Sequence, residues 1–152
     1  MFKVLLDYPS FKEEREILDR MAFTSPEIRV QPVIALDEIL HTRKLVDQIH
    51  VDEKVRDYVV HLVFATRKPD QYKLDLKHFI QFGASPRATI YLTLAAKAWA
   101  LLQGRSYVTP EDVKSVGPDV LRHRIILTYE AEAQAVTTDV IIKKIFNAVP
   151  VP

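Results

Sequence analysis

The feature that most constrains the fold is a well-formed helix start at residues 108–113, V-T-P-E-D-V. Thr109 is a good N-cap, Pro110 suits the first helical position, and Asp112 completes a variant of the capping box. Because Gly117 favours a helix end, the pattern predicts a helix that stops there. A second helix over about 118–124 and a short extended I-I-L segment are expected to follow.

Helix signals recur along the chain. Ser10 predicts a helix to about residue 20, residues 36–49 carry a loose amphipathic stripe, and Asp52 caps a helix over 53–67. Another is expected from Ser85 to about residue 103, and the last over 138–148, with Ile141, Ile142, Ile145 and Phe146 on one face. Residues 2–6, F-K-V-L-L, have the apolar character of a buried strand. The chain is therefore predicted to be a mainly α helical bundle with a short N-terminal strand–helix unit.

The charge balance excludes several classes of partner. Lys and Arg total 21 against 20 Asp and Glu, a net charge of +1 with both signs mixed along the chain. A nucleic-acid binder usually has a clustered basic excess, so no nucleic acid is expected. No apolar run is long enough to predict a membrane span, and the chain has no cysteine. These features favour a soluble cytoplasmic protein without a membrane partner.

Signatures of a complete enzyme are missing from the sequence. Its 3 glycines, at positions 83, 104 and 117, form neither a phosphate loop nor a dinucleotide-binding turn. The 5 histidines have no metal-ligand spacing, so no metal site is expected. Carboxylates gather at helix starts, where capping explains them.

Arg87 conflicts with the helix that contains it. In G-A-S-P-R, residues 83–87, the arginine occupies the first turn, where the helix dipole disfavours a cation. On a helical wheel it falls with Tyr91, Leu94, Ala98 and Leu101, which predicts that it points toward whatever the helix packs against. Two interpretations remain open: the side chain extends to water or a carboxylate, or it shares an anion such as phosphate with the helix N-terminus.

The stretch F-G-A-S-P-R-A-T-I-Y through V-T-P-E-D-V to R-H-R-I-I-L closely resembles the C-terminal lid of MoxR-type AAA+ ATPases. The segments F-K-V-L-L-D-Y-P-S and E-A-E-A-Q-A-V, with the V-P-V-P ending, extend the resemblance over nearly the whole chain. It implies that residues 1–32 are the C-terminal end of the AAA+ α/β core plus a connector, and that residues 33–152 are the helical lid.

The resemblance also implies a function. Arg87 corresponds to the sensor 2 arginine, which contacts the γ-phosphate of ATP, with Ser85 as cap and Pro86 fixing the turn. The phosphate loop, the Walker B acid, sensor 1, the arginine finger and the Mg²⁺ site belong upstream of the position that matches Met1. The chain alone is therefore expected not to hydrolyse ATP. The implied hinge is the connector around residues 26–32.

The implied partners are the chain's own N-terminal AAA+ core and further copies in a ring, a hexamer. Relatives of this kind are often paired with von Willebrand factor A-domain proteins, although no residue here specifies one. Their implied activity is chaperone-like remodelling of other proteins. The alternative from another class is a stand-alone helical module that binds protein or nucleic acid.

Three features keep two interpretations each. Arg122, His123 and Arg124 form either a basic helix end or a contact to a neighbouring subunit or nucleotide. Tyr91 and Trp99 are better explained as core residues than as a base-stacking platform. The V-P-V-P ending is either a docked or frayed terminus, which is favoured, or a docking peptide.

Overall fold

The structure, a computed structural model, describes residues 1–26 and 28–152; Glu27, inside the predicted connector, lies outside the described residues. The elements are α1 (Phe11–Met21), α2 (Leu36–Gln48), α3 (Glu53–Arg67), the 3-10 helix η1 (Pro69–Tyr72), β1 (Ile80–Phe82), α4 (Pro86–Leu102), α5 (Pro110–Leu121), β2 (Ile126–Leu127), α6 (Tyr129–Ala133) and α7 (Thr138–Ala148). The predicted mainly helical fold is confirmed.

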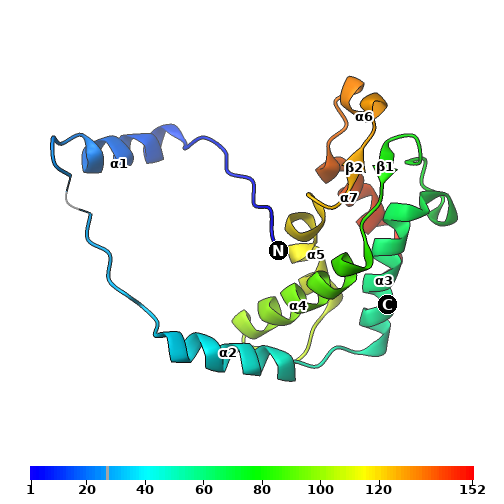
Figure 1. Cartoon of the computed structure of the whole chain (residues 1–152), viewed down its shortest axis with the longest axis horizontal. Helices are drawn as coiled ribbons and strands as arrows, with labels where there is room; N and C mark the ends of the chain where they lie inside the picture. The colour runs from blue at the N-terminus through cyan, green and yellow to red at the C-terminus, as the bar shows by residue number, and fades with distance from the viewer. Residues whose placement is uncertain (27) are drawn as a thin grey trace.

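Figure 1 shows two parts. Helices α3, α4, α5 and α7 pack together, and an arm carrying α1 and α2 starts beside α5, runs away from the packed helices and returns along α4. We call residues 1–48 the arm and residues 49–152 the lid body. None of the helices in the described ranges is both long and apolar enough to cross a bilayer.

Side-chain caps set the helix starts as predicted. The Thr109 hydroxyl accepts a hydrogen bond from the Asp112 amide, and the Asp112 carboxylate accepts one from the Thr109 amide, which completes the capping box of α5. Ser10 begins α1 in the same way with Glu13, and Asp52 caps α3. Each bond satisfies an amide at a helix N-terminus that would otherwise lack an acceptor.

The predicted stop at Gly117 is wrong. One helix, α5, runs through Gly117 and Pro118 to Leu121, so no second helix begins at residue 118. A Cβ on Gly117 would collide with the ring of Phe146 on α7, so the glycine permits close helix packing here. The helix tolerates Pro118 because its apolar face is buried; Val113, Val116, Val120 and Leu121 lie on that face.

The predicted strand at residues 2–6 is also wrong for this chain. Residues 1–10 carry no strand, and their one backbone hydrogen bond to the lid body runs from the Lys3 amide to the Asp119 carbonyl, 2.8 Å. A strand needs a neighbouring strand to bond its backbone, and none lies beside this segment in the described structure. The small sheet lies elsewhere: β1 pairs antiparallel with β2, with Ile80 opposite Leu127 and Phe82 opposite Ile126.

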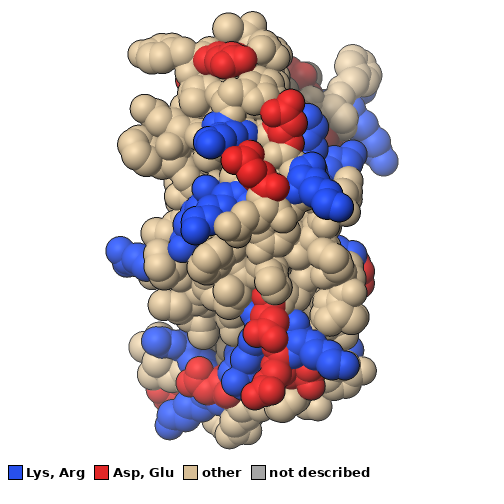
Figure 2. Space-filling view, turned by 90° about the vertical axis from the view of Figure 1, so that its right-hand side faces the viewer, with Lys and Arg blue, Asp and Glu red and all other residues tan. Residues whose placement is uncertain are grey.

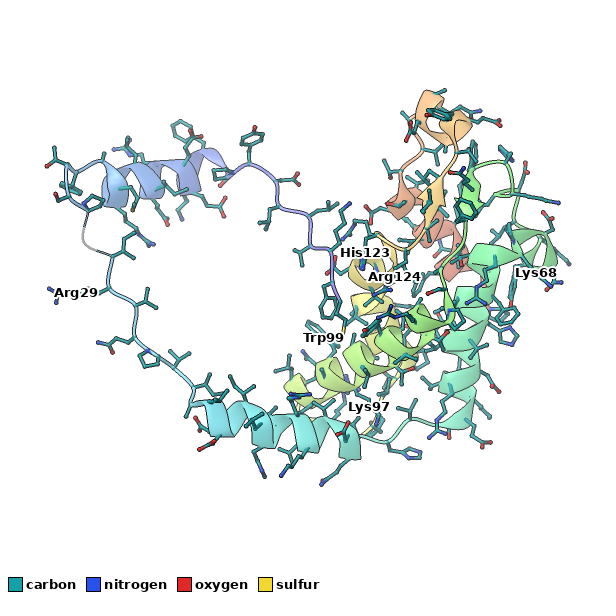
Figure 3. The ribbon with its side chains drawn as sticks, in the orientation of Figure 1. Arg29, Lys68, Lys97, Trp99, His123 and Arg124 are labelled. Carbon is teal, nitrogen blue, oxygen red and sulfur yellow. The ribbon has the colours of Figure 1, made fainter. Side chains whose placement is uncertain are left out.

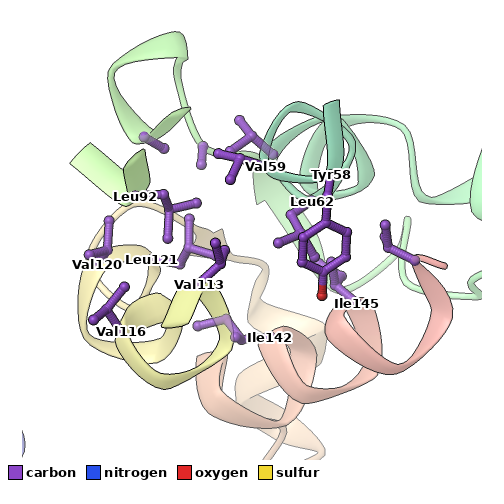
Figure 4. Packing of buried hydrophobic residues seen from close by; sticks show 14 of the residues in the cluster. Tyr58, Val59, Leu62, Leu92, Val113, Val116, Val120, Leu121, Ile142 and Ile145 are labelled. Atoms are coloured by element: carbon purple, nitrogen blue, oxygen red, sulfur yellow. The ribbon is translucent and has the colours of Figure 1, made fainter. Parts of the chain in front are cut away.

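The core lies entirely in the lid body (Figure 4). Val59 and Leu62 of α3 meet Leu92 of α4, while α5 and α7 contribute further valines, leucines and isoleucines. The core begins at Ile49, and every described residue from 1 to 41 is exposed. In the V-P-V-P ending Val149 is buried, whereas residues 150–152 are exposed and line a groove with Tyr58, His61 and Tyr72.

Candidate functional site

The loop before α4 is fixed to the C-terminal end of α3. The Thr66 hydroxyl accepts a hydrogen bond from the Ala84 amide at 2.9 Å, and Arg67 Nε donates to the Ala84 carbonyl at 2.6 Å. Thr66 and Ala84 are fully buried. A Cβ on Gly83 would collide with the backbone of Thr66 and Arg67, so only glycine allows this approach. The G-A-S-P-R motif therefore leaves α3 in one fixed direction.

Pro86 takes the first helical position of α4 as predicted, but Ser85 does not cap with its side chain. The Ser85 hydroxyl makes no capping hydrogen bond, although its carbonyl accepts from the Ala88 amide at 2.8 Å. Within the described ranges, no group accepts from the backbone N–H of Arg87. The helix N-terminus consequently keeps donors available for an external anion.

Arg87 is exposed and makes no hydrogen bond or ion pair with any residue that the structure describes. The first turn of α4 carries no acidic residue that could neutralise it. A cation placed there costs a few tenths of a kcal/mol or more. No contact in the described chain offsets this cost.

The buried face of α4 differs from the predicted one. The buried residues are Ala88, Leu92, Ala95, Ala96 and Ala100, whereas Leu94 on the predicted face is exposed and Tyr91 is half-buried. Small alanines let α3 and α5 pack closely against this helix, so the alanine face is preferred to the bulkier one. Arg87 therefore points outward. Trp99, predicted as a core residue, is 39% exposed.

The three basic residues after α5, Arg122, His123 and Arg124, differ in their contacts. The Arg122 side chain is only 10% exposed; it bonds both oxygens of Asp139 at 3.0 Å and Asp119 at 2.7 Å, and it also donates to the Lys3 carbonyl. Hydrogen bonds to Asp139 and Asp119 raise the pKa of the Arg122 guanidinium. Arg122 is thus a structural link between α5, α7 and the arm.

Its two neighbours face outward. His123 is exposed, and its pKa is lowered by partial burial and by nearby positive charge, that of Arg124 first. Arg124 donates from Nε to the Val120 carbonyl at 3.0 Å, and its guanidinium carbon lies 4.8 Å from the centre of the Tyr91 ring. Figure 3 shows His123 and Arg124 beside the end of α5 and above α4.

The arm exposes a large apolar surface (Figures 1 and 3). Neither α1 nor α2 has a buried residue, although both begin with capping hydrogen bonds. The exposed apolar side chains of the arm include Phe2, Val4, Leu5, Leu6, Phe11, Ile17, Leu18, Met21, Phe23, Ile28, Ile39 and Leu40. Exposed apolar side chains in this number indicate an interaction surface.

The sequence pattern located Arg87, Ser85 and Pro86, but it missed Thr66 and Arg67. These residues hold the motif through tertiary contacts across 17 and 18 positions of sequence, which no local periodicity reveals. Only Gly83 hinted at a close backbone approach. The described ranges contain no group of three or more His, Asp and Glu side chains placed to hold a metal ion.

Comparison with known proteins identifies the relatives. Residues 74–145 match the AAA lid domain. The chain is 42% identical to Chaperone MoxR1 of Mycobacterium tuberculosis and 34% identical to protein YeaC of Bacillus subtilis; each alignment covers the whole chain but only 40% and 45% of the respective relative. Protein MoxR of Methylorubrum extorquens is 34% identical over 68% of the chain and 32% of its own length.

A solved structure has the same arrangement. The crystal structure of a candidate ATPase from Cytophaga hutchinsonii superposes with a TM-score of 0.92 at 38% identity, covering the whole chain and 46% of that protein. The chain thus spans less than half the length of these relatives. It carries the lid region of the MoxR-type AAA+ ATPases.

Proposed function

We propose that Arg87 is a sensor 2 residue, which contacts the γ-phosphate of ATP bound to an αβα core that precedes this chain. One observation carries the proposal: the loop before α4 is clamped by Thr66 and Arg67, while the arginine that it presents has no partner among the described residues. A phosphate would satisfy the guanidinium and the exposed helix amides together. Mg²⁺ would be held by the core.

The arm supplies the contact to that core. We assign residues 1–32 to the end of the core and its connector, and residues 33–152 to the lid. Supporting this division, the arm exposes apolar side chains from residue 2 onward and begins α1 with a complete capping box.

ATP binding would then move the lid against the core through the connector at residues 26–32, a hinge mechanism. In a cytoplasmic ring of six copies, this motion would drive chaperone-like remodelling of partner proteins, von Willebrand factor A-domain proteins among them. The name of the relative Chaperone MoxR1 supports the remodelling role.

The test is Arg87→Ala in a full-length ATPase that carries this chain. A hydrogen bond to a charged group is worth about 1.5–3 kcal/mol, so ATP hydrolysis should fall about ten- to a hundredfold while ADP affinity changes much less. Arg87→Lys should restore only part of the activity, because lysine keeps the charge but lacks the planar fork. An unchanged ATPase rate in the alanine variant would refute the sensor role.

The alternative is a stand-alone helical module that binds protein or nucleic acid, and no observation favours nucleic acid as its partner. Figure 2 shows positive and negative side chains interspersed on the face that it presents. Binding of duplex DNA with a steep salt dependence would support the alternative, because phosphate contacts release counterions.

A further inference from the structure

Arg124 is held in place on the ring of Tyr91. Tyr91 lies on α4, one helical turn after Arg87. Its Nε bonds the Val120 carbonyl at 3.0 Å, and its guanidinium carbon lies 4.8 Å from the Tyr91 ring centre. This distance is typical of a cation–π contact. Two contacts on different helices therefore fix the plane of the guanidinium before any ligand arrives.

The outer half of this guanidinium is unused. No residue in the described ranges accepts a hydrogen bond from its two terminal nitrogens. By contrast, both terminal nitrogens of Arg105 bond Asp112, and Arg122 bonds two aspartates. Arg124 therefore differs from the neighbouring structural arginines: it is oriented but unpaired at the end that binds carboxylate or phosphate in a bidentate way.

Arg87 and Tyr91 share one face of α4. Residues four apart on a helix have Cβ atoms roughly 6 Å apart, and helical side chains tilt toward the N-terminus. The Tyr91 ring and the guanidinium stacked on it therefore lean toward the end of α4 that carries Arg87. Positive charge also gathers around this site. The pKa of His123 is lowered by partial burial and then by the nearby charges of Arg124, Lys3 and Arg122.

We propose that Arg124 is a second phosphate-binding arginine, which contacts the polyphosphate chain of a nucleoside triphosphate beside the phosphate bound by Arg87, and that Tyr91 is the positioning residue that holds it. The proposal rests on the sensor role of Arg87 and extends it to a two-arginine site built from α4 and the turn after α5. Two planar forks on one chain of phosphates would favour triphosphate over shorter anions.

The test uses the 152-residue chain with inorganic tripolyphosphate, and separately with ATP, in the absence of magnesium. Binding is followed by the NMR shifts of the Arg124 Nε–H and the Tyr91 ring. Arg124→Gln should weaken tripolyphosphate binding about three- to tenfold, the range for a partly exposed charged contact. Arg43→Gln removes the same charge from the exposed face of α2 and should change the affinity less than twofold.

Tyr91 separates a positioning role from simple charge. Tyr91→Phe keeps the ring and should bind like the unaltered chain, whereas Tyr91→Leu should weaken binding about as much as Arg124→Gln does. Thermal melting of each variant shows whether its fold is intact. Citrate carries a similar negative charge on carboxylates, so equal affinity for citrate and tripolyphosphate would refute the assignment to phosphate.

The outcomes separate this inference from the proposed function. If Arg87→Gln weakens tripolyphosphate binding and Arg124→Gln behaves like Arg43→Gln, the sensor role stands and the two-arginine site is refuted. If neither Arg87→Gln nor Arg124→Gln exceeds the Arg43→Gln control, the two-arginine site is refuted, and the ATPase rate of the full-length Arg87→Ala variant decides the sensor role separately. Weakening by each of the two substitutions, with Tyr91→Leu resembling Arg124→Gln, supports both.

Discussion

Asp112 combines two structural roles in one buried carboxylate. It is 2% exposed, accepts from the Thr109 amide at 2.7 Å, and forms a two-pronged ion pair with Arg105 at 2.7 and 2.5 Å. Asp112→Asn keeps the size but loses the charge, which leaves Arg105 without its counterion. We expect the free energy of unfolding to fall by about 2–4 kcal/mol at pH 7, measured by urea denaturation.

The pH dependence identifies the cause. Burial alone would raise the pKa of Asp112, but hydrogen bonds from Arg105 and Thr109 outweigh burial and hold the pKa below its usual value. This stabilisation is complete above the unfolded pKa, about 3.9, and is lost as the pH falls through the lower folded value. The difference between the unaltered chain and Asp112→Asn should therefore shrink below about pH 4. A difference that stays constant down to pH 2 would contradict this account.

Tyr58 carries a buried polar atom without a partner. The residue is 2% exposed, and its hydroxyl has no hydrogen bond within the described structure. Burial raises the pKa of this hydroxyl, with a smaller contribution from Glu111. Tyr58→Phe removes the desolvated oxygen and keeps the ring, so stability should stay the same or rise by about 1 kcal/mol. Thermal unfolding tests this, and a loss above about 1 kcal/mol would show that the oxygen has a partner.

At the scale of the elements, Gly117 shows how α5 and α7 fit together. Alanine at this position gains up to about 1 kcal/mol in helix propensity, but its Cβ would collide with the Phe146 ring. Overpacking typically costs about 1–3 kcal/mol, so Gly117→Ala should be destabilising in chemical denaturation. In a Phe146→Ala background, which makes room, the same substitution should be neutral or stabilising. Equal costs in both backgrounds would exclude the collision.

Capping chemistry explains which elements the sequence could predict. The starts of α1, α3 and α5 follow from Ser10, Asp52 and Thr109, because each cap bonds an amide two or three residues away. The β1–β2 pair joins residues more than 40 positions apart, and the five-residue α6 is too short for a periodic pattern. The extended I-I-L segment was predicted and contains β2, but its pairing with β1 and the helix α6 were not predicted.

The candidate site also has a part that the sequence predicted and a part that it did not. G-A-S-P-R identified Arg87, but the buried face of α4 was misjudged because alanine contributes little to an apolar stripe. The contact between Arg124 and Tyr91 joins two helices and has no local signature in the sequence.

At the scale of the whole molecule, residues 1–35 contribute little to the stability of the rest of the chain. Residues 1–26 and 28–35 are all exposed, and the Lys3 backbone bonds the lid body at Asp119 and Arg122. A chain of residues 36–152 should therefore unfold within about 1 kcal/mol of the complete chain. It should also stay monomeric at higher concentration in sedimentation experiments, because it loses exposed apolar surface. A large loss of stability would show that residues 1–35 are part of the folding unit.

The arm is bonded to the lid body near both of its ends. The Lys3 backbone bonds Asp119 and Arg122 at the end of α5, and the Asp47 carbonyl on α2 accepts from Lys97 of α4 at 3.0 Å. A segment bonded at both ends moves less freely than a segment bonded at one end. A domain that packs into the arm would therefore be restrained at both ends of the arm while these bonds hold. Breaking the bonds at one end of the arm would leave that domain restrained at the other end alone.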